Sequence, residues 1–376
     1  RLLAAPPRLG RYPGELNHLI YEPLGVGVVI APWNFPLAIP LGMSLAAIAA
    51  GNAVVLKPAE TASGVAAAAV RLCHAAGLSP GLLNYLPGYG EEVGAYLVSH
   101  PQVRFVAFTG SREVGLQILR QAHDTSLAQD GVRRVVCEMG GKNAIVVDSD
   151  ADLDVAVRSV VESAFGYQGQ KCSACSRAVV LSDCYERFVE RLIGATASLR
   201  FGPPEDPSNT VGPLIDQDAL KRVREYLELG RQEARLLYCR EPEQPAGFYP
   251  PIAIFGEVEP HHRLAREEIF GPVLALQRAR DFGEALRLAQ TPGYALTGGV
   301  ISRSPSHLEQ ARREFRVGNL YLNRGITGAL VGRQPFGGLG FSGIGNKAGG
   351  PNYLLQFTEE RVISENTVRR GFAPPP

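Results

Sequence analysis

The sequence lacks a charge excess, a long apolar run and a recognisable leader. Its formal net charge is +1 over 376 residues, which is not the pattern of a protein that binds nucleic acid or an anionic membrane surface. The longest apolar stretch, LGMSLAAIAAG, is too short and too interrupted by glycine to span a bilayer. The first residues do not have the pattern of a signal peptide, so none is expected. We therefore expect a soluble, cytoplasmic protein whose partners are small molecules, with no nucleic acid and no membrane span.

Cysteine is scarce and irregularly spaced. The six cysteines of the chain do not form the pattern of a secreted disulfide scaffold, so a reducing compartment is expected. Only Cys172 and Cys175 have C-x-x-C spacing, and no histidine lies between His123 and His261. A structural metal site needs more ligands than this pair offers, so no metal is expected.

Short apolar strands alternate with helical segments from Val26 to Val147. Helices are expected at 61–78 and 111–123, with Thr61 and Ser111 as N-caps. Strands that are apolar on both faces and separated by helices are typical of a parallel sheet covered on two sides. The pattern predicts an α/β, doubly wound, Rossmann-type domain, whose ligands bind beyond the carboxyl ends of the strands. Its strands are expected at 26–31, 53–57, 82–86, 103–108 and 134–138.

A second α/β region follows and leads to a cysteine. The acidic run Asp148-Ser149-Asp150 is expected to cap a helix that runs into FGYQGQKCSACS, residues 165–176. Further strands and helices are expected up to Leu322, and the segment TEERVISENTVRR predicts an exposed edge strand that finds a partner. The apolar positions of the capped helix recur with the helical period at Leu153, Ala156, Val157, Val160, Val161 and Ala164.

Two segments of the first domain could bind a dinucleotide. Gly25-x-Gly27 is not the fingerprint, because its glycines open the strand and no third glycine follows. Gly110 and Ser111 join a strand to a helix, and the N–H groups there would suit a pyrophosphate, although many such turns hold no ligand. Lys57 and Glu60 leave the second strand where a ribose would lie, and Glu60 would favour NAD over NADP. A solvated loop pair is the alternative.

Three further residues could do chemistry. Asn34, in PWNFP, could be an oxyanion donor or a turn residue. Glu138, in CEMGGKN, could be a general base or a loop acid. Cys172 could be half of a metal site, a thioredoxin-type thiol, a nucleophile supported by Glu138 and Asn34, or a buried core thiol. The missing metal ligands and the long preceding helix disfavour the first two interpretations.

Seven short motifs are spread along the chain. They are PWNFP (32–36), KPAE (57–60), FTGS (108–111), E-x-G-G-K-N from Glu138, F-x-x-x-G-Q-x-C ending at Cys172, EEIFGP (267–272) and PFGG (335–338). In this order they resemble the NAD(P)-dependent aldehyde dehydrogenase superfamily over nearly the whole chain. GQKCSA and the glycine-rich tail after Asn323 narrow the resemblance to members that oxidise L-glutamate γ-semialdehyde. Such members occur alone or as the C-terminal part of bifunctional proline-catabolic proteins.

The resemblance implies a role for each motif position. Cys172 would be the nucleophile, Asn34 and the Cys172 N–H the oxyanion donors, and Glu138 the base that activates water. NAD would be the cofactor, bound through Ala31, Pro32, Trp33, Lys57, Glu60, Gly110, Ser111, Glu268 and Phe270. The aldehyde substrate would be clamped by Phe35 and Phe336, with its α-carboxylate on Ser173 and on the backbone of Gly328 and Ala329.

The resemblance also implies an architecture of a Rossmann-type cofactor domain, an α/β catalytic domain and a β-flap for oligomerisation. The boundaries are expected at 1–22 (flap), 23–139 (NAD-binding), 140–343 (catalytic) and 344–376 (C-terminal oligomerisation segment). Residues 16–22 would pair with the C-terminal strand of a neighbouring subunit, which implies a homo-oligomer. Family members carry a longer helical N-terminal segment, and fusion to a proline dehydrogenase domain is an open alternative.

The resulting hypothesis is an enzyme that oxidises L-glutamate γ-semialdehyde to L-glutamate with NAD, through a thiohemiacetal and a thioester. The alternatives are a catalytically silent assembly domain, an aldehyde dehydrogenase of other specificity, and a CoA-acylating dehydrogenase, which would not need Glu138 to activate water. Cys175 stands where a small residue such as alanine is expected. We expect it to act as a resolving thiol that protects Cys172 from over-oxidation.

Overall fold

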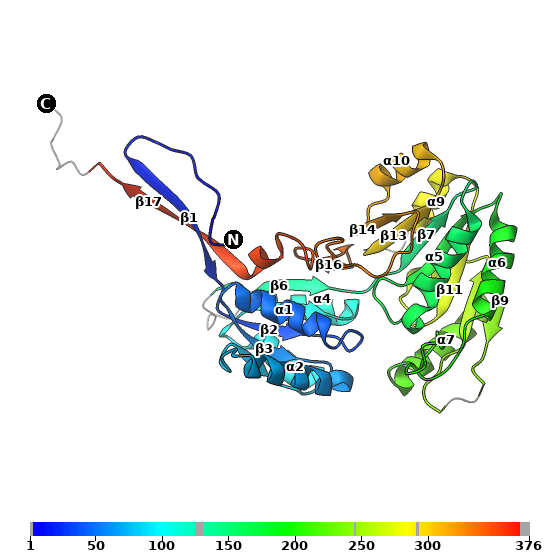
Figure 1. Ribbon diagram of the computed structural model, residues 1–376, viewed down its shortest axis with the longest axis horizontal. Coiled ribbons are helices and arrows are strands. Elements are labelled where there is room, and N and C mark those ends of the chain that lie inside the picture. Colours follow the sequence, from blue (N-terminus) through cyan, green and yellow to red (C-terminus); the bar gives the residue numbers. More distant parts are fainter. Residues whose placement is uncertain (1–2, 125–130, 244–245, 291–292, 369–376) are drawn as a thin grey trace. The chain divides into compact units, whose positions relative to one another are not determined.

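The chain forms two compact units (Figure 1). The computed structural model describes residues 3–124, 131–243, 246–290 and 293–368. The first unit comprises Arg1–Thr109, Leu116–Val136 and Gly350–Pro376, and the second comprises Gly110–Gly115 and Cys137–Gly349. The second unit is thus inserted, in sequence, into the first. No helix in these described ranges is both long and apolar enough to cross a membrane.

A sheet with the Rossmann strand order lies at the centre of the first unit. Its strands are β2 (Val26–Ile30), β3 (Ala53–Lys57), β4 (Leu83–Tyr85), β5 (Val103–Thr109) and β6 (Arg134–Glu138), in the order β4-β3-β2-β5-β6. β2 pairs in parallel with β3 and β5, and β3 pairs in parallel with β4. The strand order reverses between β2 and β5, so their carboxyl ends mark the edge where such a sheet binds its ligand. The doubly wound prediction is confirmed, and each predicted strand lies within one residue of its observed bounds.

Helices connect these strands. They are α1 (Ala38–Ala49), η1 (Glu60–Ala62), α2 (Ser63–Ala75), η2 (Gly90–Gly94), α3 (Ala95–Ser99) and α4 (Arg112–His123). Ser111 caps α4, because its Oγ accepts the Val114 N–H at 3.3 Å. The predicted cap at Thr61 is wrong, since Thr61 lies inside η1 and Ala62 precedes α2 without a side-chain bond.

Gly27 is required by packing in the middle of this sheet. A Cβ atom at this position would overlap the ring of Phe105, which is fully buried on the neighbouring strand β5. A glycine in a strand often marks such a close approach of a neighbour. The Gly25-x-Gly27 pair therefore serves the core of the sheet.

An antiparallel ribbon joins the two ends of the first unit. β1 (Glu15–Pro23) pairs with β17 (Thr358–Asn366) from Glu15 opposite Asn366 to Pro23 opposite Thr358 (Figure 1). The sequence predicted an exposed final strand, which is confirmed, and this strand pairs with β1 of the same chain. The pairing expected with a neighbouring subunit stays a prediction. Asn52 supports the pairing: it accepts the Gly25 N–H and donates to the Phe357 carbonyl, each at 2.9 Å, and so holds the chain after the end of β1 next to the start of β17.

A seven-stranded sheet organises the second unit. Its order is β14-β13-β7-β8-β11-β10-β9, and all neighbours are parallel except β9 and β10. The strands are β7 (Asn143–Val147), β8 (Cys175–Leu181), β9 (Arg235–Arg240), β10 (Ile252–Gly256), β11 (Val273–Ala279), β13 (Thr297–Ile301) and β14 (Asn319–Leu322). Two shorter pairs complete the strands: β12 (Tyr294–Ala295) pairs with β15 (Leu339–Gly340), and β16 (Gly343–Ile344) pairs with the last two residues of β6.

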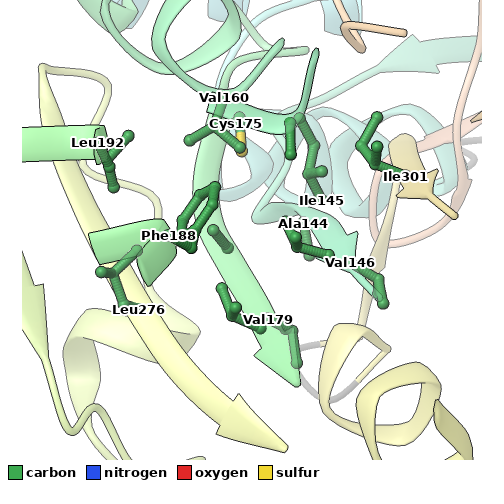
Figure 2. Close-up of a cluster of buried hydrophobic side chains, with 14 of the residues drawn as sticks. Ala144, Ile145, Val146, Val160, Cys175, Val179, Phe188, Leu192, Leu276 and Ile301 are labelled. Atoms are coloured by element: carbon green, nitrogen blue, oxygen red, sulfur yellow. The ribbon is translucent and has the colours of Figure 1, made fainter. Parts of the chain in front are cut away.

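Alternate residues of these strands supply two hydrophobic clusters. On β10, Ile252 and Ile254 join the main cluster, while Ala253 and Phe255 pack with α7 (Gln217–Glu233) on the opposite face. Figure 2 shows the main cluster, in which Ile145, Val160 and Phe188 surround a buried strand. The remaining helices are α5 (Leu153–Phe165), η3 (Gly166–Gly169), α6 (Tyr185–Ala197), α8 (Arg263–Arg266), α9 (Phe282–Ala289), α10 (Pro305–Glu314) and, in the first unit, η4 (Tyr353–Phe357).

The helix that leads to Cys172 begins as expected but with a different cap. All six apolar positions predicted for α5 are buried. Its N-cap is Asp152, whose side chain accepts two backbone N–H groups, so the cap predicted at 148–150 is wrong. Asp148 is instead fully buried and accepts from Ser302 Oγ and His307 Nδ1, each at 2.6 Å. The carboxylate therefore binds Ser302 and His307, about 150 residues away in sequence, and does not cap the helix.

Candidate active site

A left-handed turn links α5 to Cys172. Tyr167, Gln168 and Gly169 follow one another with φ of 60°, 56° and 68°. Two non-glycine residues in this region are unusual, and such strain persists only where the surroundings enforce it. A Cβ at Gly169 would lie 2.6 Å from the carbonyl oxygen of Gly271, so the turn packs directly against the EIFGP segment. Gln170 comes next in the chain, and its side chain is held in place because Oε1 accepts the Ile215 N–H at 3.1 Å.

Glu138 is the last residue of β6 and is held by a glycine loop. The Gly338 N–H donates to Glu138 Oε2 at 3.3 Å, and a Cβ at Gly337 would lie 2.8 Å from Oε1 and 3.4 Å from Lys347 Cγ. Burial raises the pKa of Glu138 to about 8, while the Gly338 N–H and the charge of Lys347 oppose that rise. A carboxyl group tuned to this range is suited to exchange protons near neutral pH.

The two glycines after Met139 bring a second carboxylate to the same segment. Glu268 Oε1 accepts the Gly141 N–H at 2.9 Å, and a Cβ at Gly140 would overlap Oε2. Burial raises the pKa of Glu268 to about 7, against the Gly141 N–H and three nearby cations. Only glycine at position 140 admits this carboxylate.

Asn143 fastens the same segment to the Cys172 loop. Its Nδ2 donates to the carbonyl oxygens of Cys172 at 2.7 Å and Ala174 at 2.9 Å, and its Oδ1 accepts the Thr297 N–H at 3.0 Å. The side chain is 3% exposed, so these bonds are shielded from water. A Cβ at Gly141 would lie 2.7 Å from the Cys172 carbonyl oxygen. Residues 138–143 therefore support both carboxylates and the cysteine.

Cys172 is half-buried, and its surroundings strongly disfavour ionisation of the thiol. Burial, followed by the charges of Glu268 and Glu138, raises its pKa to about 12. The N–H groups of Ser173 and Cys172 itself oppose the rise. The resting group is a thiol at neutral pH, so nucleophilic attack requires a proton acceptor, and Glu138 is close enough for its charge to be felt at the sulfur.

The EIFGP segment is anchored from its outer side. Arg222 donates to the Glu268 carbonyl oxygen at 2.6 Å and stacks over the ring of Tyr226. The Tyr226 hydroxyl in turn bonds to Glu267. Phe270 adopts φ of 63°, which turns the chain sharply after the buried carboxylate. The predicted cofactor contacts of Glu268 and Phe270 stay predictions, but the Glu268 side chain is rigidly placed.

Lys57 and Glu60 form an ion pair at the carboxyl end of β3 in the first unit. Lys57 Nζ donates to Glu60 Oε1 at 2.6 Å and to the Pro58 carbonyl at 3.1 Å. The lysine side chain is 3% exposed and the glutamate side chain 40% exposed, so this is not a fully solvated pair. Partial burial alone would raise the pKa of Glu60. The hydrogen bonds and charge of Lys57, together with the backbone hydrogen bonds, outweigh this effect, so the pKa is lower than usual. An ionised, accessible carboxylate at this edge fits a ribose hydroxyl pair.

The other residues predicted to touch cofactor lie at strand ends. Ala31 directly follows β2, and its N–H donates to the Lys57 carbonyl at 3.1 Å, so the PWNFP turn (32–36) begins beside the Lys57–Glu60 pair. Asn34 in this turn is 5% exposed. Gly110 donates to the Glu138 carbonyl at 3.0 Å and precedes the N-terminus of α4. The predicted contacts of Pro32, Trp33, Gly110 and Ser111 with cofactor stay predictions, as does the oxyanion role of Asn34.

The predicted substrate residues of the second unit lie on two segments. Ser173 is 8% exposed, and its carbonyl accepts the Thr297 hydroxyl at 3.3 Å. Gly328 has φ of 78° and open space around its Cα, and the half-buried Ala329 follows it. Phe336 is half-buried and pairs through its backbone with Ala348. Phe35 belongs to the first unit, so the predicted clamp of Phe35 and Phe336 stays a prediction.

Cys175 lies in the hydrophobic core. It is 1% exposed, its thiol donates to the Arg177 carbonyl at 3.1 Å, and burial raises its pKa to about 12 (Figure 2). These surroundings favour a structural thiol and argue against a resolving thiol, which must be accessible and ionisable. Among the residues described here, no three His, Cys, Asp or Glu side chains gather closely enough to hold a metal ion.

Two residues of the site were not singled out from the sequence. Lys142 and Asn143 stand in the E-x-G-G-K-N motif, of which only Glu138 was assigned a role. A signal was present: Asn143 begins a strand whose other residues are all apolar, and Lys142 precedes it. Polar residues at the end of a fully buried strand need partners, and such positions are candidates for functional sites.

Comparisons with known proteins agree with this arrangement. The aldehyde dehydrogenase family matches residues 5–363. A 1-pyrroline-5-carboxylate dehydrogenase of Geobacillus kaustophilus is 51% identical over 353 residues, covering 94% of this chain and 68% of the relative, and that of Bacillus subtilis is 49% identical over 352 residues, with the same coverage.

Solved structures give the same result. A Thermus 1-pyrroline-5-carboxylate dehydrogenase with bound NAD has a TM-score of 0.94 at 48% identity, covering 97% of this chain and 70% of that one. Proline utilization A of Bdellovibrio bacteriovorus has a TM-score of 0.95 at 50% identity, and this chain spans only 39% of its length. The chain described here belongs to the aldehyde dehydrogenase family.

Proposed function

We propose that this chain oxidises L-glutamate γ-semialdehyde to L-glutamate with NAD. One observation carries the proposal: a single segment, residues 138–143, supports the Glu138 carboxylate, the Glu268 carboxylate and the Cys172 loop together. A cysteine, a tunable carboxyl group and a second carboxylate for a sugar are what an aldehyde-oxidising site needs. Relatives of about half identity that are named 1-pyrroline-5-carboxylate dehydrogenases support this substrate.

The residues present fit NAD. In the first unit the partly exposed Glu60 carboxylate, charged and oriented by Lys57, can accept two ribose hydroxyls at the carboxyl edge of β3. A 2′-phosphate at that place would meet the negative charge of Glu60, so NAD is preferred to NADP. In the second unit Glu268 can accept the hydroxyls of the other ribose. When bound, NAD supplies a hydride acceptor for the carbon that Cys172 attacks.

Cys172 begins the reaction. Its Sγ adds to the aldehyde carbon and a C–S bond forms, while the thiol proton passes to a Glu138 carboxylate oxygen. The transfer is needed because the thiol, with a pKa of about 12, is not ionised at neutral pH. The Cys172 N–H stabilises the developing oxyanion. Asn143 restrains the backbone at Cys172 by holding its carbonyl, in the peptide that follows the N–H group. With the hydride acceptor that bound NAD would supply, oxidation of this adduct would leave a thioester on Cys172.

Glu138 ends the reaction. After its proton has left to solvent, Glu138 accepts a proton from a water molecule whose oxygen attacks the thioester carbon. The C–S bond breaks, the carboxylate product leaves and Cys172 regains a proton. The pKa of about 8 suits both directions of transfer near neutral pH. The glycine loop at 337–338 keeps the carboxyl group in place throughout.

Further parts of this proposal concern the surroundings of the enzyme. The six cysteines are all free in the structure, which supports a reducing, cytoplasmic location. The exposed ribbon of β1 and β17 supports assembly into a homo-oligomer. The backbone N–H groups around Gly328 and Ala329, with Ser173, are proposed to bind the α-carboxylate of the substrate. The similarity to proline utilization A supports fusion to a proline dehydrogenase domain as an alternative context.

NADH formation by the purified chain tests the proposal. The semialdehyde and propanal are compared as substrates, with Cys172→Ala as the inactive variant. Cys239→Ala removes another half-buried free cysteine and should leave activity unchanged. We expect turnover with the semialdehyde, little with propanal, and none in Cys172→Ala.

Each other outcome identifies a different function. Equal rates with propanal would refute the substrate assignment. Turnover that requires coenzyme A would indicate the acylating reaction. Absence of calorimetric NAD binding would indicate a silent assembly domain.

A further inference from the structure

Ser163 is a buried serine near the end of α5. It is 1% exposed, and the next two residues of the helix, Ala164 and Phe165, belong to the main hydrophobic cluster. Alanine has a higher helix propensity than serine and carries no polar side-chain atom that needs a partner. The packing of α5 alone therefore does not explain a hydroxyl group at this position.

The hydroxyl of Ser163 has a partner on a segment far away in sequence. Its Oγ accepts the Ile326 N–H at 3.1 Å. Ile326 is itself fully buried, and its side chain packs in the same hydrophobic cluster. A Cβ at Gly325 would lie 3.0 Å from Ser163 Oγ, so the chain already passes close to α5 one residue earlier. The segment that begins at Ile326 is thus anchored to α5 by a hydrogen bond that is shielded from water.

Residues 327–329 lie between this anchor and a second one. At the far end, Gln334 Oε1 accepts the Leu330 N–H at 3.1 Å, and the Leu330 carbonyl accepts the Gln334 N–H at 2.9 Å. Within the described part of the chain, none of the N–H groups of 327–329 donates a hydrogen bond. Gly328 is exposed and has φ of 78°, in the left-handed region. Consecutive free N–H groups at such a turn form a concave site that suits an anion.

The same helix leads to the nucleophile. The left-handed turn at 167–169 follows α5 and packs against the EIFGP segment. Beyond this turn, the Cys172 carbonyl is held by Asn143 Nδ2 at 2.7 Å. One buried helix therefore supports Cys172 at its end and the free N–H groups of 327–329 through Ser163.

We propose that Ser163 is a positioning residue that holds the N–H groups of 327–329 at a fixed reach from Cys172, and that this reach selects aldehydes which carry an α-carboxylate. The inference rests on the proposed function, because it concerns the substrate assigned there. Ser163 does not touch the substrate. Without its hydroxyl the Ile326 N–H loses its partner and the loop can shift, so substrate binding must first order the N–H groups that meet the carboxylate.

Steady-state kinetics with two aldehydes test the proposal. kcat and KM are measured for wild type and Ser163→Ala with the semialdehyde, and kcat/KM with propanal is taken from the initial slope of rate against concentration. Ser163→Ala should raise KM for the semialdehyde at least about tenfold, as expected when a hydrogen bond to a charged group is lost. kcat with the semialdehyde and kcat/KM with propanal should change less than about twofold, because only binding of the carboxylate is impaired.

Ser302→Ala is the matched control. Ser302 is also 1% exposed, and its Oγ accepts the Ser304 N–H at 3.0 Å, but it directly follows β13 and makes no side-chain bond to the 325–330 loop. The control should lower the melting temperature, because a buried N–H loses its partner, while the kinetics with both aldehydes stay as in wild type. If Ser163→Ala does not fold, Ser163→Cys replaces it, because a thiol of similar size is a weak acceptor.

The possible outcomes are distinct. Wild-type protein that does not oxidise the semialdehyde refutes the proposed function, and this inference with it. Wild-type turnover with an unchanged KM in Ser163→Ala, or an equal loss with both aldehydes, refutes the role of Ser163 alone. A rise in KM that is confined to the semialdehyde and absent from Ser302→Ala supports it.

Discussion

Replacing Asn143 with alanine should slow acylation of Cys172 and lower stability together. The substitution removes the donor to the Cys172 and Ala174 carbonyls and the acceptor of the Thr297 N–H. Each buried polar group left unsatisfied costs about 1–3 kcal/mol, so the three together should destabilise the second unit by at least about 3 kcal/mol. Without Asn143 the backbone at Cys172 loses a restraint on its carbonyl, and the Cys172 N–H in the preceding peptide can then move out of place. One lost oxyanion donor slows chemistry roughly 100-fold.

Rapid mixing separates these two effects. The burst of NADH in the first turnover reports acylation, and the steady state reports hydrolysis of the thioester. Thr196→Val is the matched control, because it removes a fully buried hydrogen bond of 2.7 Å within α6 of the same unit. The control should lower the melting temperature with a normal burst. A normal burst rate in Asn143→Ala, with lowered stability, would refute the role of Asn143 in orienting Cys172.

Three further predictions concern the base, the sheet and the second cysteine. The rate of thioester hydrolysis should rise with pH through about 8, because Glu138 must be ionised to accept a proton. Lys347→Met should move this inflection to higher pH, because it removes a positive charge near Glu138. A pH-rate profile with the same inflection in both proteins would contradict this. Gly27→Ala should destabilise the first unit by several kcal/mol, since its Cβ would overlap the Phe105 ring, and a melting curve like that of wild type would show that the sheet can adjust. Cys175→Ala should leave the thiol-reversible part of peroxide inactivation unchanged, because Cys175 is sealed in the core, and loss of reversal in the activity assay would restore the resolving-thiol hypothesis.

The strands of the first unit were predictable because their signal is local. All of them except β4 are short runs that contain β-branched residues and are bounded by turn residues, and their burial follows from that composition. The helix before Cys172 was equally clear from its apolar period. For these elements the local sequence pattern was sufficient.

The caps and the support of the site depend on residues far away in sequence. The sequence predicted Asp148 as a helix cap, but its carboxylate binds Ser302 and His307. The role of Asn143 likewise depends on its hydrogen bonds to Cys172 and Thr297. No spacing rule encodes such partners. The roles of Glu138 and Cys172 were proposed through their motifs, whereas the unpartnered state of Lys142 became visible only with the side chains in place.

The first unit is built from segments before and after the second unit, and this has a consequence for the order in which the two units fold. Its core includes Phe357, which is fully buried. The ring centroids of Phe357 and Phe105 are 5.4 Å apart, and the Phe357 carbonyl accepts a hydrogen bond from Asn52. A chain growing on the ribosome therefore synthesises the Rossmann strands first but cannot close their core until more than 200 further residues, Cys137–Gly349, have been added. Domains generally fold as they emerge. Of the two units, the one whose strands are made first is thus the last to be finished, and the nascent chain must shield an incomplete apolar sheet while the second unit folds.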